Sequence, residues 1–245
     1  MKSKVILLLI VLALFAGRRG QAEDTRTSNP APVCRVGQQA PAIGFWTWSA
    51  NSRVKVYIRL VDFKADQLPA LFSAMDSWNL VSEQTASGVK FEYQGDTATE
   101  LTCTGCMTII RGTVFDKAKR HLTELKAYSA HHDQLISYAT IIVDQSLTNP
   151  EAILNALVHE LGHNLGLLDC YSCKEKSTVM NQLKGVNRSN GMEGPTGCDI
   201  AQVRRAYEEL KVRVRPSPPN RNQIDEGEEP VDDDTPVIIP KPPRL

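Results

Sequence analysis

The chain has 245 residues, and its 28 basic and 28 acidic side chains give a formal net charge of zero. With 42% hydrophobic residues, it is long enough and apolar enough for one folded domain with a substantial core. The balanced charge, without a basic cluster in the sequence, disfavours a nucleic acid as the partner.

Residues 1–22 have the pattern of a secretory signal peptide. Lys2 and Lys4 precede an apolar run over residues 5–16, and residues 20–22 provide small side chains for a cleavage site. We therefore expect export to an extracellular or periplasmic location. The apolar run is short for a bilayer span, so we expect no stable membrane insertion after cleavage. Two arginines after the run leave an uncleaved anchor as the minor alternative.

Residues 23–49 are interpreted as an N-terminal extension and residues 50–214 as the single folded domain. Apolar residues alternate along the predicted strands and recur at helical spacing along the predicted helices. The strands are expected over residues 54–63, 89–93, 107–115, 122–128 and 135–143, and the first helix over residues 66–82.

Six cysteines follow the signal peptide, an even number that favours disulfides in an exported chain. Our preferred pairing is Cys34–Cys198, Cys103–Cys106 and Cys170–Cys173. Several other pairings are open to six cysteines, and the two Cys-x-x-Cys pairs leave a structural zinc as a less favoured alternative.

His131, His132 and Asp133 form a cluster of side chains that often bind metals. No further cluster of such residues at suitable spacing accompanies them, so a solvated turn is the favoured interpretation. A structural Ca²⁺ or a second Zn²⁺ there is the alternative.

A second helix is expected to begin after Asn149, with Pro150 in its first turn. Residues four apart on a helix lie on the same face, one turn apart. His159 and His163 therefore point the same way and can share a metal ion. Glu160 lies beside them, where it can reach a water on that metal. This is the His-Glu-x-x-His arrangement of zinc hydrolases.

A third ligand has to come from beyond the helix, because further helical turns lead away from the ion. Gly166 is placed where a helix end that needs a positive φ favours glycine. Asp169 follows three residues later and can return a carboxylate oxygen to the metal. Three protein ligands with one open position are typical of catalytic zinc.

The sequence of residues 159–169, followed by Ser-Thr-Val-Met-Asn at residues 177–181, resembles the zinc motif and methionine turn of metzincin metallopeptidases. It is most similar to their matrixin-like branch. Asp169 stands where most metzincins have a third histidine, and aspartate is known there in some bacterial-type members. The resemblance extends over roughly residues 50–212, and outside the two motifs it rests on the order of elements.

The resemblance implies an α+β fold with a twisted, mostly parallel five-stranded sheet. Two long helices would back the sheet, and a small C-terminal subdomain would end in a closing helix over residues 200–212. One antiparallel edge strand would fall near residues 122–128, where it can hold an extended peptide by strand addition. Met180 would form a hydrophobic floor beneath the metal.

The same resemblance gives Cys34 a second interpretation, as the cysteine that keeps many matrixins latent. We favour the disulfide, because the residues around Cys34 lack the glycine and aspartate of the latency motif.

The activity that the resemblance implies is hydrolysis of peptide bonds by a monomeric, secreted zinc endopeptidase. One catalytic zinc would be held by His159, His163 and Asp169, and Glu160 would be the general base. The rival from another class is a zinc-stabilised module that binds peptides without cutting them, and the intact Glu160 argues against it. A third alternative, hydrolysis of a non-peptide substrate, is disfavoured by the expected edge strand.

Residues 215–245 differ in composition from the rest. Eight of the 14 prolines lie there together with an acidic run, a composition that cannot bury a core. We expect a disordered tail, with an attachment segment as the alternative.

Overall fold

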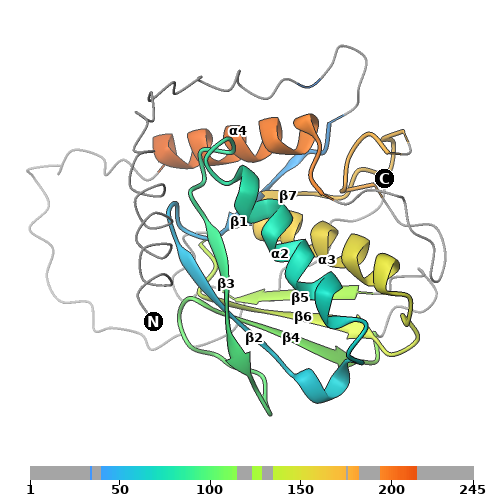
Figure 1. Ribbon diagram of the computed structural model, residues 1–245. Helices are drawn as coiled ribbons and strands as arrows, with labels where there is room; N and C mark the ends of the chain where they lie inside the picture. Colours follow the sequence, from blue (N-terminus) through green and yellow to red (C-terminus); the bar gives the residue numbers. More distant parts are fainter. Residues whose placement is uncertain are drawn as a thin grey trace, which may run out of the picture. The chain divides into compact units, whose positions relative to one another are not determined.

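A five-stranded sheet is the largest feature of the fold in the computed structural model (Figure 1). The structure describes Cys34 and residues 40–114, 123–128, 135–174, 176–181 and 194–213. The sheet has the strand order β3-β2-β4-β6-β5. Its members are β2 (Arg53–Ile58), β3 (Lys90–Asp96), β4 (Cys106–Gly112), β5 (Thr123–Tyr128) and β6 (Tyr138–Asp144).

Four of these strands are parallel, and β5 runs antiparallel to β6 at one edge. Leu125 of β5 lies opposite Ile141, and Met107 of β4 lies opposite Ala139. The mostly parallel sheet and the antiparallel edge strand expected near residues 122–128 are therefore confirmed.

Strand β2 shows why this segment forms a half-buried strand. Val54, Val56 and Ile58 are fully buried, and side chains two apart lie on the same face of a strand. The strand was predicted to reach residue 63 but ends at Ile58, because a 3₁₀ helix, η1 (Leu60–Asp62), follows it. Asp62 accepts a hydrogen bond from the Arg59 guanidinium at 2.6 Å, and this local contact stabilises the turn.

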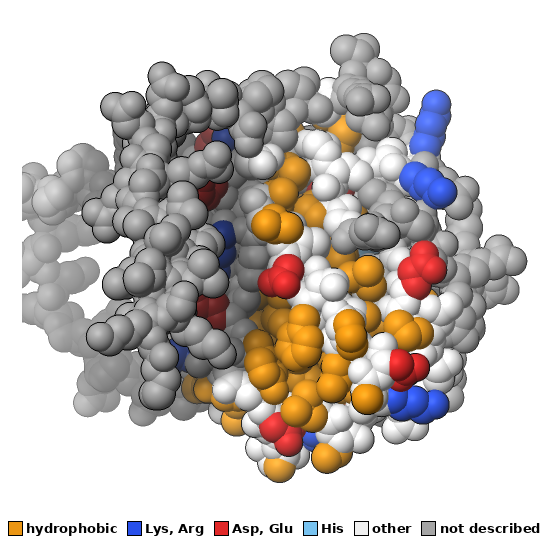
Figure 2. Space-filling view, in the orientation of Figure 1, with side chains coloured by type: hydrophobic (Ala, Val, Ile, Leu, Met, Phe, Trp, Pro, Cys, Tyr) orange, Lys and Arg blue, Asp and Glu red, His pale blue; other side chains and the backbone are white. Residues whose placement is uncertain are grey.

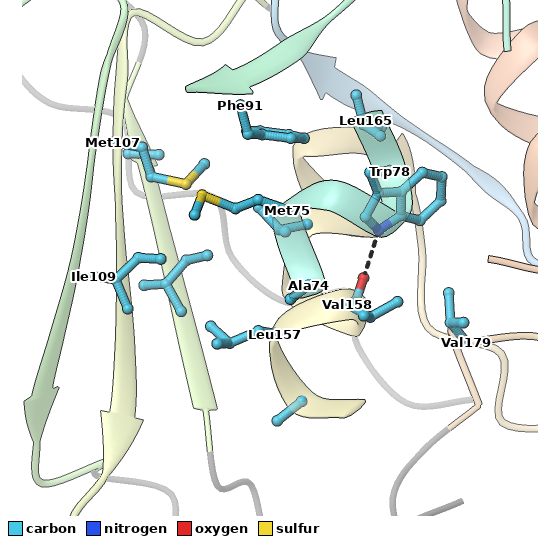
Figure 3. Close-up of a cluster of buried hydrophobic side chains, with 14 of the residues drawn as sticks. Ala74, Met75, Trp78, Phe91, Met107, Ile109, Leu157, Val158, Leu165 and Val179 are labelled. Carbon is cyan, nitrogen blue, oxygen red and sulfur yellow. Dashed lines mark hydrogen bonds between the residues drawn. The ribbon is translucent and has the colours of Figure 1, made fainter. Parts of the chain in front are cut away.

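Two helices, α2 (Leu68–Val81) and α3 (Pro150–Asn164), pack against each other, and the core lies between them and the sheet (Figures 1 and 3). Figure 3 shows Met75 of α2 and Leu157 of α3 beside Met107 and Ile109 of the sheet, whereas Trp78 lies on the side of α2 away from these strands. The indole nitrogen of Trp78 donates to the carbonyl of Val158 at 2.9 Å. This buried bond joins the two helices directly, consistent with the need to pair polar atoms in a core.

A third helix, α4 (Gly197–Arg213), packs on a second, two-stranded sheet. That sheet pairs β1 (Ile43–Thr47) with β7 (Leu165–Leu167) in antiparallel orientation. The Tyr207 hydroxyl of α4 donates to the carbonyl of Trp48 at 3.0 Å. The two-stranded sheet was not predicted, and β1 lies in the segment that we interpreted as an extension.

The fold class is thus α+β, but it differs from the expectation in detail. The described residues form three α-helices of 14, 15 and 17 residues, and the expected closing helix is the longest of them. "Two long helices" is therefore too narrow a description. Among the described residues, none of the helices has the length and hydrophobicity that a membrane span requires.

The six cysteines form the disulfides Cys34–Cys198, Cys103–Cys106 and Cys170–Cys173, which is the pairing preferred from the sequence. Cys34–Cys198 ties the N-terminal segment to the start of α4. The pairing places Cys34 in a disulfide rather than at a metal.

Apolar side chains also gather on the outer surface over α2 and β3 (Figure 2). Leu80 and Tyr93 are exposed there, and the Tyr93 ring packs edge-on against Phe72 with 5.1 Å between ring centroids.

Candidate metal centre

Helix α3 carries two of the three candidate ligands. Its N-terminus is capped by Asn149, whose side chain accepts hydrogen bonds from the amides of Glu151 and Ala152, and this fixes where the helix begins. His159 and His163 consequently lie one turn apart, with ring centroids separated by 4.7 Å. Both Nε2 atoms face the carboxylate of Asp169.

The third candidate ligand is brought back by a sharp change of direction after the helix. Gly166 has a φ of +89°, in the region that favours glycine, as predicted for this position. Asp169 Oδ1 then lies 3.1 Å from His159 Nε2 and 3.4 Å from His163 Nε2. The structure therefore places the three predicted ligands together.

The two distances between Asp169 and the histidines fit a zinc ion. Bonds of about 2.0–2.2 Å in a tetrahedral site put neighbouring ligand atoms about 3.3–3.6 Å apart, close to the two distances observed. The three ligand atoms, one from each residue, lie within 4.8 Å of one another. Among the residues described, no other group of three or more His, Cys, Asp or Glu side chains lies close enough to hold a metal ion. Two nitrogens and one carboxylate oxygen form a common zinc donor set.

Backbone carbonyls hold both imidazoles in the tautomer that a metal requires. The carbonyl of Val179 lies 2.9 Å from His159 Nδ1, and the carbonyl of Leu167 lies 2.7 Å from His163 Nδ1. A carbonyl can only accept, so the Nδ1 atoms carry protons, and in the neutral imidazoles that bind a metal the Nε2 lone pairs face the site. His163 Nε2 is buried without a hydrogen-bond partner, as expected for an atom that binds an ion.

Without a metal, the three ligands perturb one another's protonation. Burial acts to lower the pKa of His159, but its hydrogen bond to Asp169 and the negative charges of Glu160 and Asp169 outweigh burial, so that pKa is raised. Burial acts in turn to raise the pKa of Asp169, but the two imidazoles outweigh it and hold that pKa well below its usual range. The metal-free site therefore contains a carboxylate beside an imidazole that is readily protonated.

Glu160 is buried beside the ligands, with 1% of its surface exposed. Thr123, the first residue of β5, donates its hydroxyl proton to Glu160 Oε1 at 2.5 Å. The edge strand thus begins at the carboxylate that was predicted to be the base. Sequence reasoning missed Thr123, because only the pairing of β5 with β6 brings it next to α3.

Met180 is fully buried and packs against α3 at Gly162, where an added Cβ would lie 2.5 Å from its sulfur. The turn that carries Met180 is anchored from α4. Asp199 accepts hydrogen bonds from the Thr178 hydroxyl, from the amide of Val179 at 3.1 Å and from the amide of Thr196 at 2.8 Å. The last of these bonds belongs to a capping box. Through Val179, Asp199 also supports the carbonyl that orients His159.

Two further points concern residues other than the three candidate ligands and Glu160. His131, His132 and Asp133 lie outside the described residues, so the possibility of a second metal stays a prediction. Tyr171 was not predicted to take part, yet its hydroxyl donates to Asp169 Oδ2 at 2.9 Å. Apart from the short distance between the two residues along the chain, no sequence pattern pointed to this contact.

No protein-family model and no curated protein matches the chain. What can be said of function therefore rests on the residues and geometry of the site.

Proposed function

We propose that the protein is a secreted zinc endopeptidase, as its resemblance to matrixin-like metzincins implies. The observation that carries the proposal is the convergence of His159 Nε2, His163 Nε2 and Asp169 Oδ1, in which the carboxylate oxygen lies 3.1 and 3.4 Å from the two nitrogens and all three ligand atoms lie within 4.8 Å of one another. Glu160, which is buried, lies beside these ligand atoms. A purely structural zinc site would have four protein ligands and no need of a base.

The residues have distinct roles in the proposed reaction. His159, His163 and Asp169 would hold zinc, with the two carbonyl-bound Nδ1 atoms fixing the ring orientations. When bound, zinc lowers the pKa of a water molecule and polarises the carbonyl group that is attacked. Glu160 accepts the proton of the attacking water and delivers it to the leaving amine. The Thr123 hydroxyl donates to Glu160 Oε1, which holds the carboxylate in place.

The edge strand supports a peptide as the substrate. The sheet order ends at β5, so within the described residues no strand pairs with its outer side. An extended peptide added there would form backbone hydrogen bonds with β5. Because β5 begins at Thr123, in contact with Glu160, such a peptide would pass the proposed base.

The test is hydrolysis of unfolded casein by the purified protein, with and without a zinc chelator. We expect cleavage that requires the metal. Glu160→Gln should keep its metal and lose about 10²- to 10⁴-fold in rate, whereas the exposed Glu151→Gln on the same helix should behave like the wild type. Hydrolysis by Glu160→Gln at a near-normal rate would refute the assignment of the base.

Metal analysis of the same samples separates the alternatives. Zinc at one ion per chain is expected, and iron in its place would contradict the proposal, because two histidines and one carboxylate also suit non-haem iron. One zinc per chain without cleavage of casein, together with retention of an extended peptide, would favour the binding module instead. Cleavage of a small ester but of no peptide would favour hydrolysis of another substrate class.

A further inference from the structure

The two carboxylate oxygens of Asp169 have different partners. Oδ1 faces the Nε2 atoms of both histidines at 3.1 and 3.4 Å. Oδ2 accepts the hydroxyl proton of Tyr171 at 2.9 Å. The Asp169 side chain is 5% exposed, so its orientation is set by these protein contacts.

The loop that carries Tyr171 is itself fixed. Tyr171 lies inside the loop closed by the Cys170–Cys173 disulfide. The amide of Cys170 donates to the carbonyl of Met180 at 2.8 Å, and the side-chain amide of Asn181 donates to the carbonyl of Cys173 at 3.1 Å. Both ends of the loop are therefore attached to the methionine turn, and the tyrosine is held over the outer oxygen of Asp169.

This arrangement bears on how the carboxylate can bind a metal. A carboxylate ligand can bind through one oxygen or through both, and binding through both would use the position that a catalytic zinc keeps open. A hydrogen bond to one oxygen favours binding through the other, as partners of metal ligands commonly do. Histidine, the usual third ligand in metzincins, has no second ligand atom directed at the same ion and needs no such restraint.

We propose that Tyr171 is a positioning residue that restricts Asp169 to coordination through Oδ1 and so preserves the open position on the metal. The inference rests on the proposed function only in requiring that His159, His163 and Asp169 bind a metal. It extends that function by assigning a role to a residue outside the metal motif.

The test uses Co²⁺ in place of zinc, in the full-length protein. Tetrahedral Co²⁺ absorbs visible light more strongly than five- or six-coordinate Co²⁺, so the spectrum reports the coordination of Asp169 independently of turnover. Tyr171→Phe removes one hydroxyl group from a side chain that is 46% exposed. We expect its Co²⁺ complex to absorb less strongly and its affinity for Co²⁺ to fall about 10- to 100-fold.

Tyr93→Phe is the matched control, because it removes the same group from another exposed tyrosine, on β3. It should leave the spectrum and the affinity unchanged, and far-ultraviolet circular dichroism should show the same fold for all three proteins. A spectrum and an affinity of Tyr171→Phe equal to those of the wild type would overturn the role of Tyr171 alone. Failure of the wild type to bind Co²⁺ or Zn²⁺ would overturn the metal site and this inference together. Metal binding without peptide cleavage would overturn only the proposed activity.

Discussion

Gly166 connects α3 to the segment that carries Asp169, and the structure predicts what a methyl group there would cost. Its φ of +89° costs an L-residue about 1–2 kcal/mol. An added Cβ would also lie 2.7 Å from Thr47 Cγ2 and 3.4 Å from Ala206 Cβ, and overpacking of this kind costs about 1–3 kcal/mol. Alanine also lowers the conformational entropy of the unfolded chain, which favours the folded state by about 0.4–1 kcal/mol. With this gain subtracted, Gly166→Ala should destabilise the protein by about 2–4 kcal/mol.

Gly105→Ala separates the cost of the positive φ from the cost of the steric clash. Gly105 has a φ of +78°, and an added Cβ there would meet no atom within 4 Å. It should therefore lose only the conformational term, about 1 kcal/mol. Thr47→Ser removes the Cγ2 atom that the new methyl group would strike. In a double-mutant cycle, Gly166→Ala should accordingly cost less on the Thr47→Ser background than on the wild-type background.

The assay is urea unfolding of the metal-free protein with its disulfides intact, so that metal binding does not contribute to the measured stability. Equal losses for Gly166→Ala and Gly105→Ala, or no coupling to Thr47→Ser, would refute the steric argument. A second readout is zinc affinity. A shift of β7 moves the Leu167 carbonyl that orients His163, so Gly166→Ala should also bind zinc more weakly than Gly105→Ala does.

Two further predictions concern pH. The pKa of His159 is raised above 6.5 in the metal-free protein, so a zinc ion that binds there must displace a proton. The affinity for zinc should therefore rise about tenfold per pH unit until the pH exceeds that raised pKa. Competition titrations that find no change in zinc affinity as the pH rises from 6.5 would contradict this. Burial raises the pKa of Asp199 above 3.8 despite the hydrogen bonds that its carboxylate accepts. The protonated form of Asp199 therefore contributes to the free energy of unfolding at low pH, and this contribution is lost as the pH rises from 3.8 through the raised pKa. The wild type should lose unfolding free energy relative to Asp199→Asn over that interval, and a difference in urea stability that does not vary with pH would count against it.

The parts of the site that the sequence predicted are those governed by short-range geometry. Residues four apart must share a helix face, so His159 and His163 could be paired without a structure. The positive φ at Gly166 was predictable for the same reason, because it follows from where the helix has to end. Asp169 lies close enough along the chain that a single reversal brings it to the same point.

The parts that were missed depend on contacts between distant segments. β7 has three residues, and its pairing with β1 joins positions more than a hundred residues apart; no periodicity is readable over so short a strand. Thr123 meets Glu160 only because β5 takes one particular register against β6. Sequence patterns specify which face of an element is apolar, but they do not specify which of its polar residues meets a given partner.

The ligands of the proposed metal site come from α3 and the residues just after β7, but the groups that orient them come from three further places. The Leu167 carbonyl belongs to β7, the Val179 carbonyl to the methionine turn, and Asp199 of α4 holds the amide of Val179. Asp199 directly follows Cys198, which is bound to Cys34. Zinc affinity and the docking of α4 should therefore reinforce each other, because an ion that binds the oriented imidazoles stabilises every contact that orients them.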